Sequence, residues 1–178
     1  MAQSALVVLV PEVQTLVGDL RERHDPSAAE GVPPHITVLY PFVPPEDIND
    51  AVLEALGCVL RNTPVFSFRL SRIGRFPDTL YLAPDPANPF IQLTQCIAQR
   101  FPEHPPYEGL HDTICPHLTV ARGSKALDAI ETVLAHRLHH HGSPDLVCSS
   151  LALIENSSGR WKTSARWGFD ALGTGRIH

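Results

Sequence analysis

Short apolar segments alternate along the chain with longer segments in which apolar and polar residues recur at helical spacing. Prolines lie at many of the boundaries, and no low-complexity linker or run of like charge interrupts the series. Apolar runs and two-residue alternation, rich in β-branched and aromatic residues, indicate strands. We therefore expect short strands at residues 6–10, 33–42, 65–72, 79–83, 116–123, 146–154 and 161–169.

Helical periodicity falls between these strands. It predicts helices at residues 12–23, 45–61, 88–101 and 124–139. Proline stands at the start of two of them, at Pro45 and Pro89, as is typical of a first helical turn. Asn88 directly precedes Pro89, so we expect it to be the N-cap of its helix.

The order of elements repeats in the two halves of the chain. In each half an apolar strand precedes a helix, a loop that ends in proline, a strand with the pattern His-x-Thr, another helix and a further strand. The histidines of these patterns, His35 and His117, stand 117 − 35 = 82 positions apart. We predict a single domain over residues 1–178, made of duplicated lobes at about 1–77 and 78–178 between which strands can exchange.

Strands separated by helices can build either a doubly wound parallel sheet or an α+β arrangement. The parallel class that binds nucleotides carries a glycine-rich turn after its first strand. Neither residues 6–10 nor residues 79–83 lead into such a turn. The sequence therefore favours an α+β fold with two lobes.

Each His-x-Thr strand has one polar and one apolar face. Side chains alternate along a strand, so His35 and Thr37 share a face, as do His117 and Thr119. The apolar residues between them can pack against helices. If a pseudo-two-fold axis relates the lobes, the two polar faces meet around one point.

Two imidazoles and two hydroxyls around one point suit a phosphate group. Threonine hydroxyls can donate to its non-bridging oxygens, and two histidines on opposite sides can serve as general base and general acid. The ordinary histidine pKa of about 6.5 leaves both protonation states accessible near neutrality. Such chemistry requires no metal ion. One histidine alone would more often be structural, but the pair with its threonines indicates catalysis.

The two motifs, PHITVLYPF at residues 34–42 and PHLTVAR at residues 116–122, resemble the paired H-x-[ST]-x motifs of the 2H phosphoesterase superfamily. That superfamily includes 2′-5′ RNA ligase-like proteins and cyclic nucleotide phosphodiesterases. The resemblance covers nearly the whole chain in element order. It implies a bilobal, duplicated α+β fold in which two antiparallel sheets surround a central cleft and the helices lie outside.

The resemblance also implies roles for individual residues. His35 and His117 would be the catalytic pair, Thr37 and Thr119 would hold the phosphate, and Arg122 matches an arginine often found at the end of the second motif. No cofactor is implied. Strict alternation places Arg122 on the face opposite His117, so contact with phosphate requires a twist or bulge at the strand end. Otherwise Arg122 is an ordinary surface charge.

Composition narrows the ligand and the setting. A formal charge of −5, from 14 Lys and Arg against 19 Asp and Glu, argues against a broad basic surface for nucleic acid. We expect the protein to bind a small nucleotide or the end of an RNA. No apolar run is long enough to cross a bilayer, and the chain opens without the basic start of a secretory signal. We therefore expect a cytoplasmic monomer.

Other candidate residues have a functional and a structural explanation. His136 and His140 have the spacing of two metal ligands on one helix face, but basic residues at a helix end also interact favourably with the helix dipole. Tyr40 and Phe42 can stack on a base or belong to the core. His111 in the loop before the second motif can form part of the site's rim or be solvated. The four cysteines contain no C-x-x-C pair and are expected to be buried thiols: Cys58, Cys96, Cys115 and Cys148.

Three functions of different classes are considered. The first is a metal-independent phosphoesterase that hydrolyses a cyclic phosphodiester, such as a 2′,3′-cyclic nucleotide or an RNA terminus, through His35 and His117. The alternative is a non-catalytic module that binds a nucleotide or RNA end in the same cleft. A metallohydrolase built on the histidines of residues 136–141 ranks last, because no carboxylate-rich ligand set accompanies them.

Overall fold

The computed structural model describes residues 1–109 and 113–170, and its strands form two four-stranded sheets. The first sheet has the order β2-β1-β7-β8, with β1 at Ser4–Leu9, β2 at His35–Leu39, β7 at Ser150–Glu155 and β8 at Lys162–Gly168. The second has the order β5-β4-β3-β6, with β3 at Phe66–Phe76, β4 at Thr79–Asp85, β5 at Leu118–Arg122 and β6 at Asp145–Cys148. All strand pairs in the two sheets are antiparallel, which confirms the α+β prediction.

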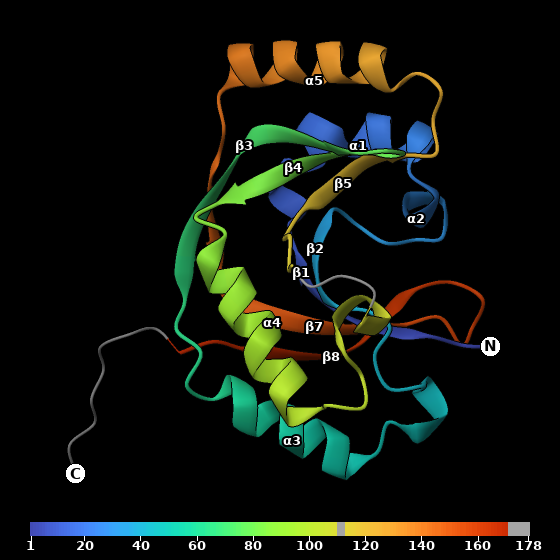
Figure 1. Ribbon diagram of the computed structural model, residues 1–178, viewed down its shortest axis with the longest axis vertical. Coiled ribbons are helices and arrows are strands. Elements are labelled where there is room, and N and C mark those ends of the chain that lie inside the picture. The colour runs from blue at the N-terminus through green and yellow to red at the C-terminus, as the bar shows by residue number, and fades with distance from the viewer. Residues whose placement is uncertain (110–112, 171–178) are drawn as a thin grey trace.

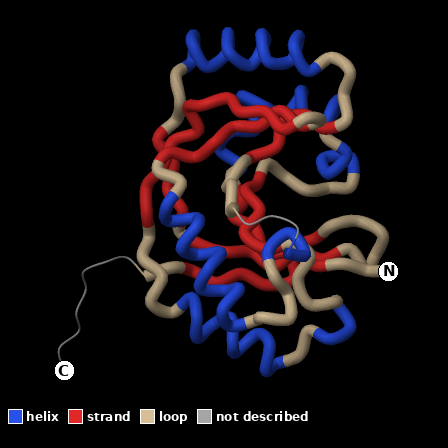
Figure 2. The backbone as a smooth tube through the Cα atoms, viewed as in Figure 1, coloured by secondary structure: helices blue, strands red, loops and turns tan. Residues whose placement is uncertain are grey.

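Helices cover the outer face of each sheet, as Figures 1 and 2 show. The helices are α1 (Gln14–His24), α2 (Pro26–Ala29), α3 (Asp50–Leu60), α4 (Asn88–Arg100) and α5 (Leu127–His141), with short 3-10 turns at Pro11–Val13, Pro45–Asp47 and Pro106–Gly109. Helices α1 and α5 contact the second sheet, and α3 and α4 contact the first. The opposite side of each sheet is its inner face.

Neither sheet is built from one half of the sequence. The first sheet takes β1 and β2 from the expected N-terminal lobe and β7 and β8 from the expected C-terminal lobe. The second sheet takes β3 from the N-terminal lobe and its other three strands from the C-terminal lobe. The expected lobe boundary near residue 77 falls in the turn of the β3–β4 hairpin, both strands of which belong to the second sheet. Helices also pack on strands of the other expected lobe: α1 packs on β5, and α4 packs on β2. The duplication itself stays a prediction.

The single strand expected at residues 146–154 is wrong. The segment contains two strands, β6 and β7, which separate at Ser149 and join different sheets. An apolar run cannot reveal which partner each half of it will find, because pairing is decided by tertiary contacts. This division carries the chain from the second sheet back to the first.

Helix starts also differ from the sequence prediction. The N-cap of α4 is Ala87 and makes no side-chain capping bond, so Asn88 is the first residue of the helix and not its cap. Helix α3 begins at Asp50, where the side chain of Asn49 accepts a hydrogen bond from the backbone N–H of Val52 at 3.1 Å. Such a bond satisfies a donor that the first helical turn would leave free. Helix α5 begins three residues later than expected, at Leu127.

The main core packs the helices against both sheets in one continuous cluster of buried side chains. Of the cysteines only Cys148 is buried, while Cys58 and Cys96 are exposed and Cys115 is partly exposed, so the expectation of four buried thiols is wrong. Within residues 1–109 and 113–170, no helix has the length and apolar character needed to cross a membrane.

Candidate active site

The first His-x-Thr motif lies on β2, the edge strand of the first sheet. Ile36 and Val38 are buried in the main core, at 0% and 4% exposure. His35 and Thr37 therefore point to the inner face, where both are partly exposed. The apolar half of the motif anchors the strand on the helices, and the polar half is left accessible.

The second motif repeats this arrangement on β5, the edge strand of the second sheet. Leu118 and Val120 are fully buried, and His117 and Thr119 are partly exposed on the inner face. The two edge strands contact each other, and Figure 1 shows β2 and β5 side by side at the centre of the molecule. Both polar faces therefore lie where the two sheets meet.

Matching hydrogen bonds hold the two imidazole rings. Nδ1 of His35 lies 2.8 Å from the carbonyl oxygen of Pro33, and Nδ1 of His117 lies 2.7 Å from that of Cys115. A carbonyl oxygen can only accept, so each Nδ1 carries a proton and donates it. In the neutral ring Nε2 then has the free lone pair. Each histidine thus presents Nε2 as the atom that can accept or deliver a proton.

Burial lowers the pKa of both histidines. The pKa of His35 falls to about 4, chiefly through loss of solvent, with smaller effects from Arg21 and His117. Burial also lowers the pKa of His117, and the charge of Arg122 lowers it further. These charge effects place the two imidazoles and Arg122 within electrostatic reach of one another. Near neutral pH the free site holds two uncharged rings.

A β-bulge occurs at the same place in both motifs. On β2 the pairing with β1 passes from Thr37 to Leu39, and on β5 the pairing with β4 passes from Thr119 to Ala121. The valine that follows each threonine is therefore an extra residue. A bulge of this kind shifts the alternation of side chains by one position.

The bulge resolves the position of Arg122. Strict alternation would send Arg122 to the face opposite His117, but beyond the bulge Arg122 pairs with Thr79, which lies on the same side of β4 as Tyr81. Tyr81 in turn pairs with Thr119. Arg122 therefore belongs to the inner face with Thr119, as contact with a shared ligand requires.

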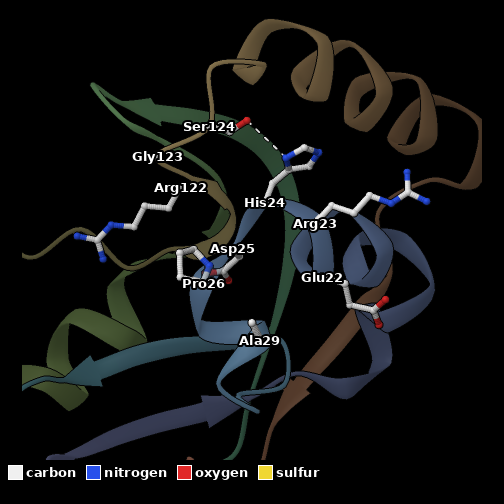
Figure 3. Close-up of a pocket in the computed structure, with 9 residues that line it drawn as sticks. All are labelled: Glu22, Arg23, His24, Asp25, Pro26, Ala29, Arg122, Gly123 and Ser124. Carbon is white, nitrogen blue, oxygen red and sulfur yellow. Dashed lines mark hydrogen bonds between the residues drawn. The ribbon is translucent and has the colours of Figure 1, made fainter.

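The side chain of Arg122 is 67% exposed, and its Nε lies 3.8 Å from a carboxylate oxygen of Asp78, a long and weak ion pair. Arg122 also borders a pocket of about 310 Å³ that includes His24 and Ser124. Figure 3 shows the guanidinium pointing away from these two residues, which interact with each other. The group can reorient toward a ligand without losing a strong partner.

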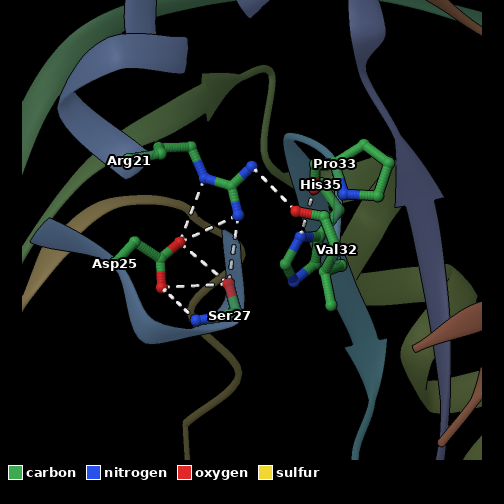
Figure 4. A network of polar contacts seen from close by, with 6 residues as sticks. All are labelled: Arg21, Asp25, Ser27, Val32, Pro33 and His35. Carbon is green, nitrogen blue, oxygen red and sulfur yellow. Dashed lines mark hydrogen bonds and ion pairs between the residues drawn. The ribbon is translucent and has the colours of Figure 1, made fainter. Parts of the chain in front are cut away.

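A buried ion pair supports the loop that leads to His35. Arg21 and Asp25 on α1 and its C-cap are joined at 2.8 Å, with both side chains 3% exposed. Arg21 also donates to the carbonyl oxygen of Val32 at 3.2 Å, and the Asp25 carboxylate accepts from Ser27 (Figure 4). The sequence prediction missed this network. Its only signal was an Arg and an Asp four positions apart at a helix end.

Aromatic side chains enclose His117. The rings of Phe76 and Tyr81 lie 5.1 and 5.2 Å from its imidazole, centroid to centroid. Gly74 faces Tyr81 across the β3–β4 pair, and a Cβ at Gly74 would overlap the tyrosine ring. Glycine at this position therefore leaves the space that the Tyr81 ring occupies beside His117. No pattern in the sequence singles out Gly74 or Tyr81.

Of the remaining candidates, Phe42 contributes to the core, and His136 and His140 lie away from this site. Phe42 is buried at 3% exposure and packs on Phe101, whereas Tyr40 is 40% exposed. His136 and His140 lie on α5, on the outside of the second sheet. No group of three or more His, Cys, Asp or Glu side chains suited to a metal ion occurs within the part of the chain described. His111, a candidate for the rim of the site, lies outside the described residues.

Comparisons with known proteins agree with this geometry. A family model described as the 2′-5′ RNA ligase superfamily matches residues 9–160. Crystal structures of E. coli LigT with 3′-AMP and with NADP+ have TM-scores of 0.62 and 0.60, at 18% and 19% identity. They cover 94% of this chain, and 97% and 96% of their own chains are covered. A crystal structure of a Thermus thermophilus protein has a TM-score of 0.64 at 17% identity, with 96% and 100% covered.

A protein of Bacillus cytotoxicus that bears the provisional name of phosphoesterase is 33% identical over 72 residues. The match spans 39% of this chain and 41% of that relative, about two fifths of its length. The solved structures establish a shared two-lobed fold, and the family model covers most of the sequence. The chain therefore belongs to the 2′-5′ RNA ligase superfamily.

Proposed function

We propose that this protein is a metal-independent phosphoesterase that hydrolyses a cyclic phosphodiester, either a 2′,3′-cyclic nucleotide or the cyclic phosphate at an RNA terminus. One observation carries the proposal: both histidines donate from Nδ1 to the carbonyl two residues earlier, on adjacent edge strands with identical bulges. Family membership supports an enzyme of this class, and nucleotides bound to LigT support a nucleotide ligand.

The reaction needs one proton taken and one proton given. Nε2 of one neutral imidazole accepts a proton from water as the water oxygen attacks phosphorus. Nε2 of the other, protonated imidazole gives its proton to the ribose oxygen as the P–O bond breaks. The ring is opened to a phosphate monoester. The pair holds the same number of protons as before, but the proton now sits on the other imidazole, and exchange with solvent restores the starting arrangement.

The other residues of the site would hold the phosphate during this step. Thr37 and Thr119 have hydroxyls that can donate to the non-bridging oxygens. The guanidinium of Arg122 can offset the charge that accumulates on them. All of these groups come from one chain, so the proposed site is complete in a monomer.

The lowered histidine pKa values predict a pH profile. The profile of kcat/KM reports the free enzyme, and in the free enzyme both imidazoles lose their protons below the ordinary value of 6.5. The midpoint of the limb that requires a protonated acid should therefore lie below pH 6.5. An anionic substrate raises the pKa of nearby histidines, so the corresponding limb of kcat should lie at higher pH.

The test is hydrolysis of a panel of nucleoside 2′,3′-cyclic phosphates and short RNAs with cyclic ends, in the presence of a chelator. The variants are His35→Ala and His117→Ala, and His139→Ala on the exposed end of α5 is the matched control. We expect each of the first two to lower kcat/KM by roughly 10²- to 10⁴-fold, and the control to keep wild-type activity. Unchanged turnover in either variant would exclude the proposed mechanism.

The same experiment separates the enzyme from the binding module. A module would bind the cyclic phosphates in calorimetry, with no turnover over long incubation and no effect of pH on product formation. Loss of all activity in chelator would instead indicate a required metal ion. Either outcome would overturn the proposal.

A further inference from the structure

One arginine on the inner face of the second sheet has no role in the site described so far. Arg72 on β3 pairs with Ala83 on β4. The next pairs place Leu82 opposite Leu118, so Ala83 lies beside His117, the residue before Leu118. Paired residues of an antiparallel sheet point to the same face. His117, just before β5, Ala83 on β4 and Arg72 on β3 therefore form a row. The three strands β5, β4 and β3 lie next to one another in Figure 1.

Arg72 is close enough to reach a ligand bound at His117. Neighbouring strands lie about 4.8 Å apart, so the Cα atoms of Arg72 and His117 are separated by about 10 Å. Only the methyl group of Ala83 stands between them in this row. The positive charge of Arg72 also lowers the pKa of the Tyr81 phenol, against the larger effect of burial. The Tyr81 ring lies 5.2 Å from the His117 ring.

Arg72 differs from the other arginines of the same strand. Arg69 is paired with Asp145, and Arg75 with Asp128 at 2.7 Å. None of the ion pairs or side-chain hydrogen bonds among the described residues involves Arg72, which is exposed. Because the chain carries a formal charge of −5, this group is not part of a general basic surface.

Two arginines thus lie on the inner face of the second sheet, on different strands. Arg122 belongs to the second motif and faces Thr119. Arg72 lies on β3, two strands in from the edge strand β5 that contacts β2, and so it stands farther than Arg122 from the place where the two motifs meet. The separation matches a second anionic group on the same ligand.

We propose that Arg72 binds a second phosphate of the substrate, the one on the 5′ side of the nucleotide that bears the cyclic phosphate. This inference rests on the proposed function and sharpens it. The preferred substrate is then an RNA end, or a cyclic nucleotide that also carries a 5′-phosphate, and not a cyclic nucleotide with a free 5′-hydroxyl.

The test compares three substrates with one base: a nucleoside 2′,3′-cyclic phosphate, the same compound with a 5′-phosphate, and a dinucleotide ending in the cyclic phosphate. In Arg72→Ala, kcat/KM should fall about tenfold to a hundredfold for the second and third substrates, as expected for one charge-assisted hydrogen bond. For the first substrate it should stay within about twofold of wild type. Loss for only one of the two phosphorylated substrates identifies the second phosphate as a terminal monoester or an internal diester.

Arg72→Lys should restore part of the loss, because it keeps the charge. Arg75→Ala is the matched control, since Arg75 lies on the same strand but faces α5. An equal loss with all three substrates, or no loss with any, overturns the proposal. If the wild type hydrolyses none of them, the proposed function fails, and calorimetric binding of the same ligands to wild type and Arg72→Ala still decides the subsite.

Discussion

The low pKa of His35 should make the protein lose stability as the pH falls. The folded value is about 4, against 6.5 for an exposed histidine. Between these values the unfolded chain binds a proton at this position and the folded chain does not. Since the free energy of unfolding rises with pH wherever the unfolded state binds more protons, it must decrease as the pH falls from 6.5 toward 4. Below pH 4 this contribution is constant.

The size of the effect follows from the two values. The difference of 6.5 − 4 = 2.5 pH units, at about 1.4 kcal/mol for each, amounts to at most about 3.5 kcal/mol. From pH 7 to pH 5 the contribution is about 2 kcal/mol, because the unfolded histidine titrates only below about 6.5. This window lies above the range in which most carboxylates titrate, but His117, whose pKa is also lowered, contributes in the same window. The share of His35 is therefore measured as the difference between wild type and a variant at this position.

The assay is urea unfolding of wild type and His35→Asn at pH 7 and pH 5. Asparagine keeps an N–H near the position of Nδ1, so the bond to Pro33 can be retained while the titrating group is removed. We expect the variant to lose about 2 kcal/mol less than wild type between the two pH values. The control His139→Asn should show the wild-type loss. An equal loss in wild type and His35→Asn would refute the reasoning, whatever the stability of the variant at pH 7.

Three further results are expected. Gly74→Ala should displace the Tyr81 ring, lower the free energy of unfolding by about 1–3 kcal/mol and move the pKa of His117 toward 6.5, which urea unfolding and an NMR titration would detect. Asp25→Asn should cost about 3 kcal/mol or more in urea unfolding, because Arg21 then remains buried without a counter-charge. Saturating sulfate should raise the pKa of both motif histidines in an NMR titration, and unchanged values would count against an anion site between them.

The fold was predictable where the hydrophobic periodicity and the positions of proline and glycine agree. Alternation and apolar runs located the strands, and the missing glycine-rich turn correctly argued against a parallel sheet. The division of residues 146–154 into β6 and β7 was not predictable, because both halves have the same pattern and differ only in the sheet they join. Caps failed for a related reason: Asn88 has the right chemistry for a cap, but the helix begins one residue earlier than that role allows.

The candidate site also has a part that the sequence predicts and a part that it does not. His35, Thr37, His117 and Thr119 could be placed on one polar face each, since two-residue alternation holds within three residues. Arg122 could not, because one bulge residue reverses the face on which it lies. Bulges depend on pairing with the neighbouring strand, and the local sequence does not show which strand that will be.

The electrostatics of the site explain how two matched histidines can take unequal roles. With both pKa values lowered, neither ring is charged near neutral pH, so the rings cannot attract the phosphate. Under the proposed function, attraction must come from arginine. Both Arg122 and Arg72 lie on the inner face of the second sheet, where Arg122 has one long ion pair and Arg72 has no ion pair within residues 1–109 and 113–170. Once bound, the phosphate favours the protonated form of a nearby imidazole. In the proposed reaction, substrate binding itself then creates the general acid, and the position of the leaving oxygen decides which of the two histidines it is.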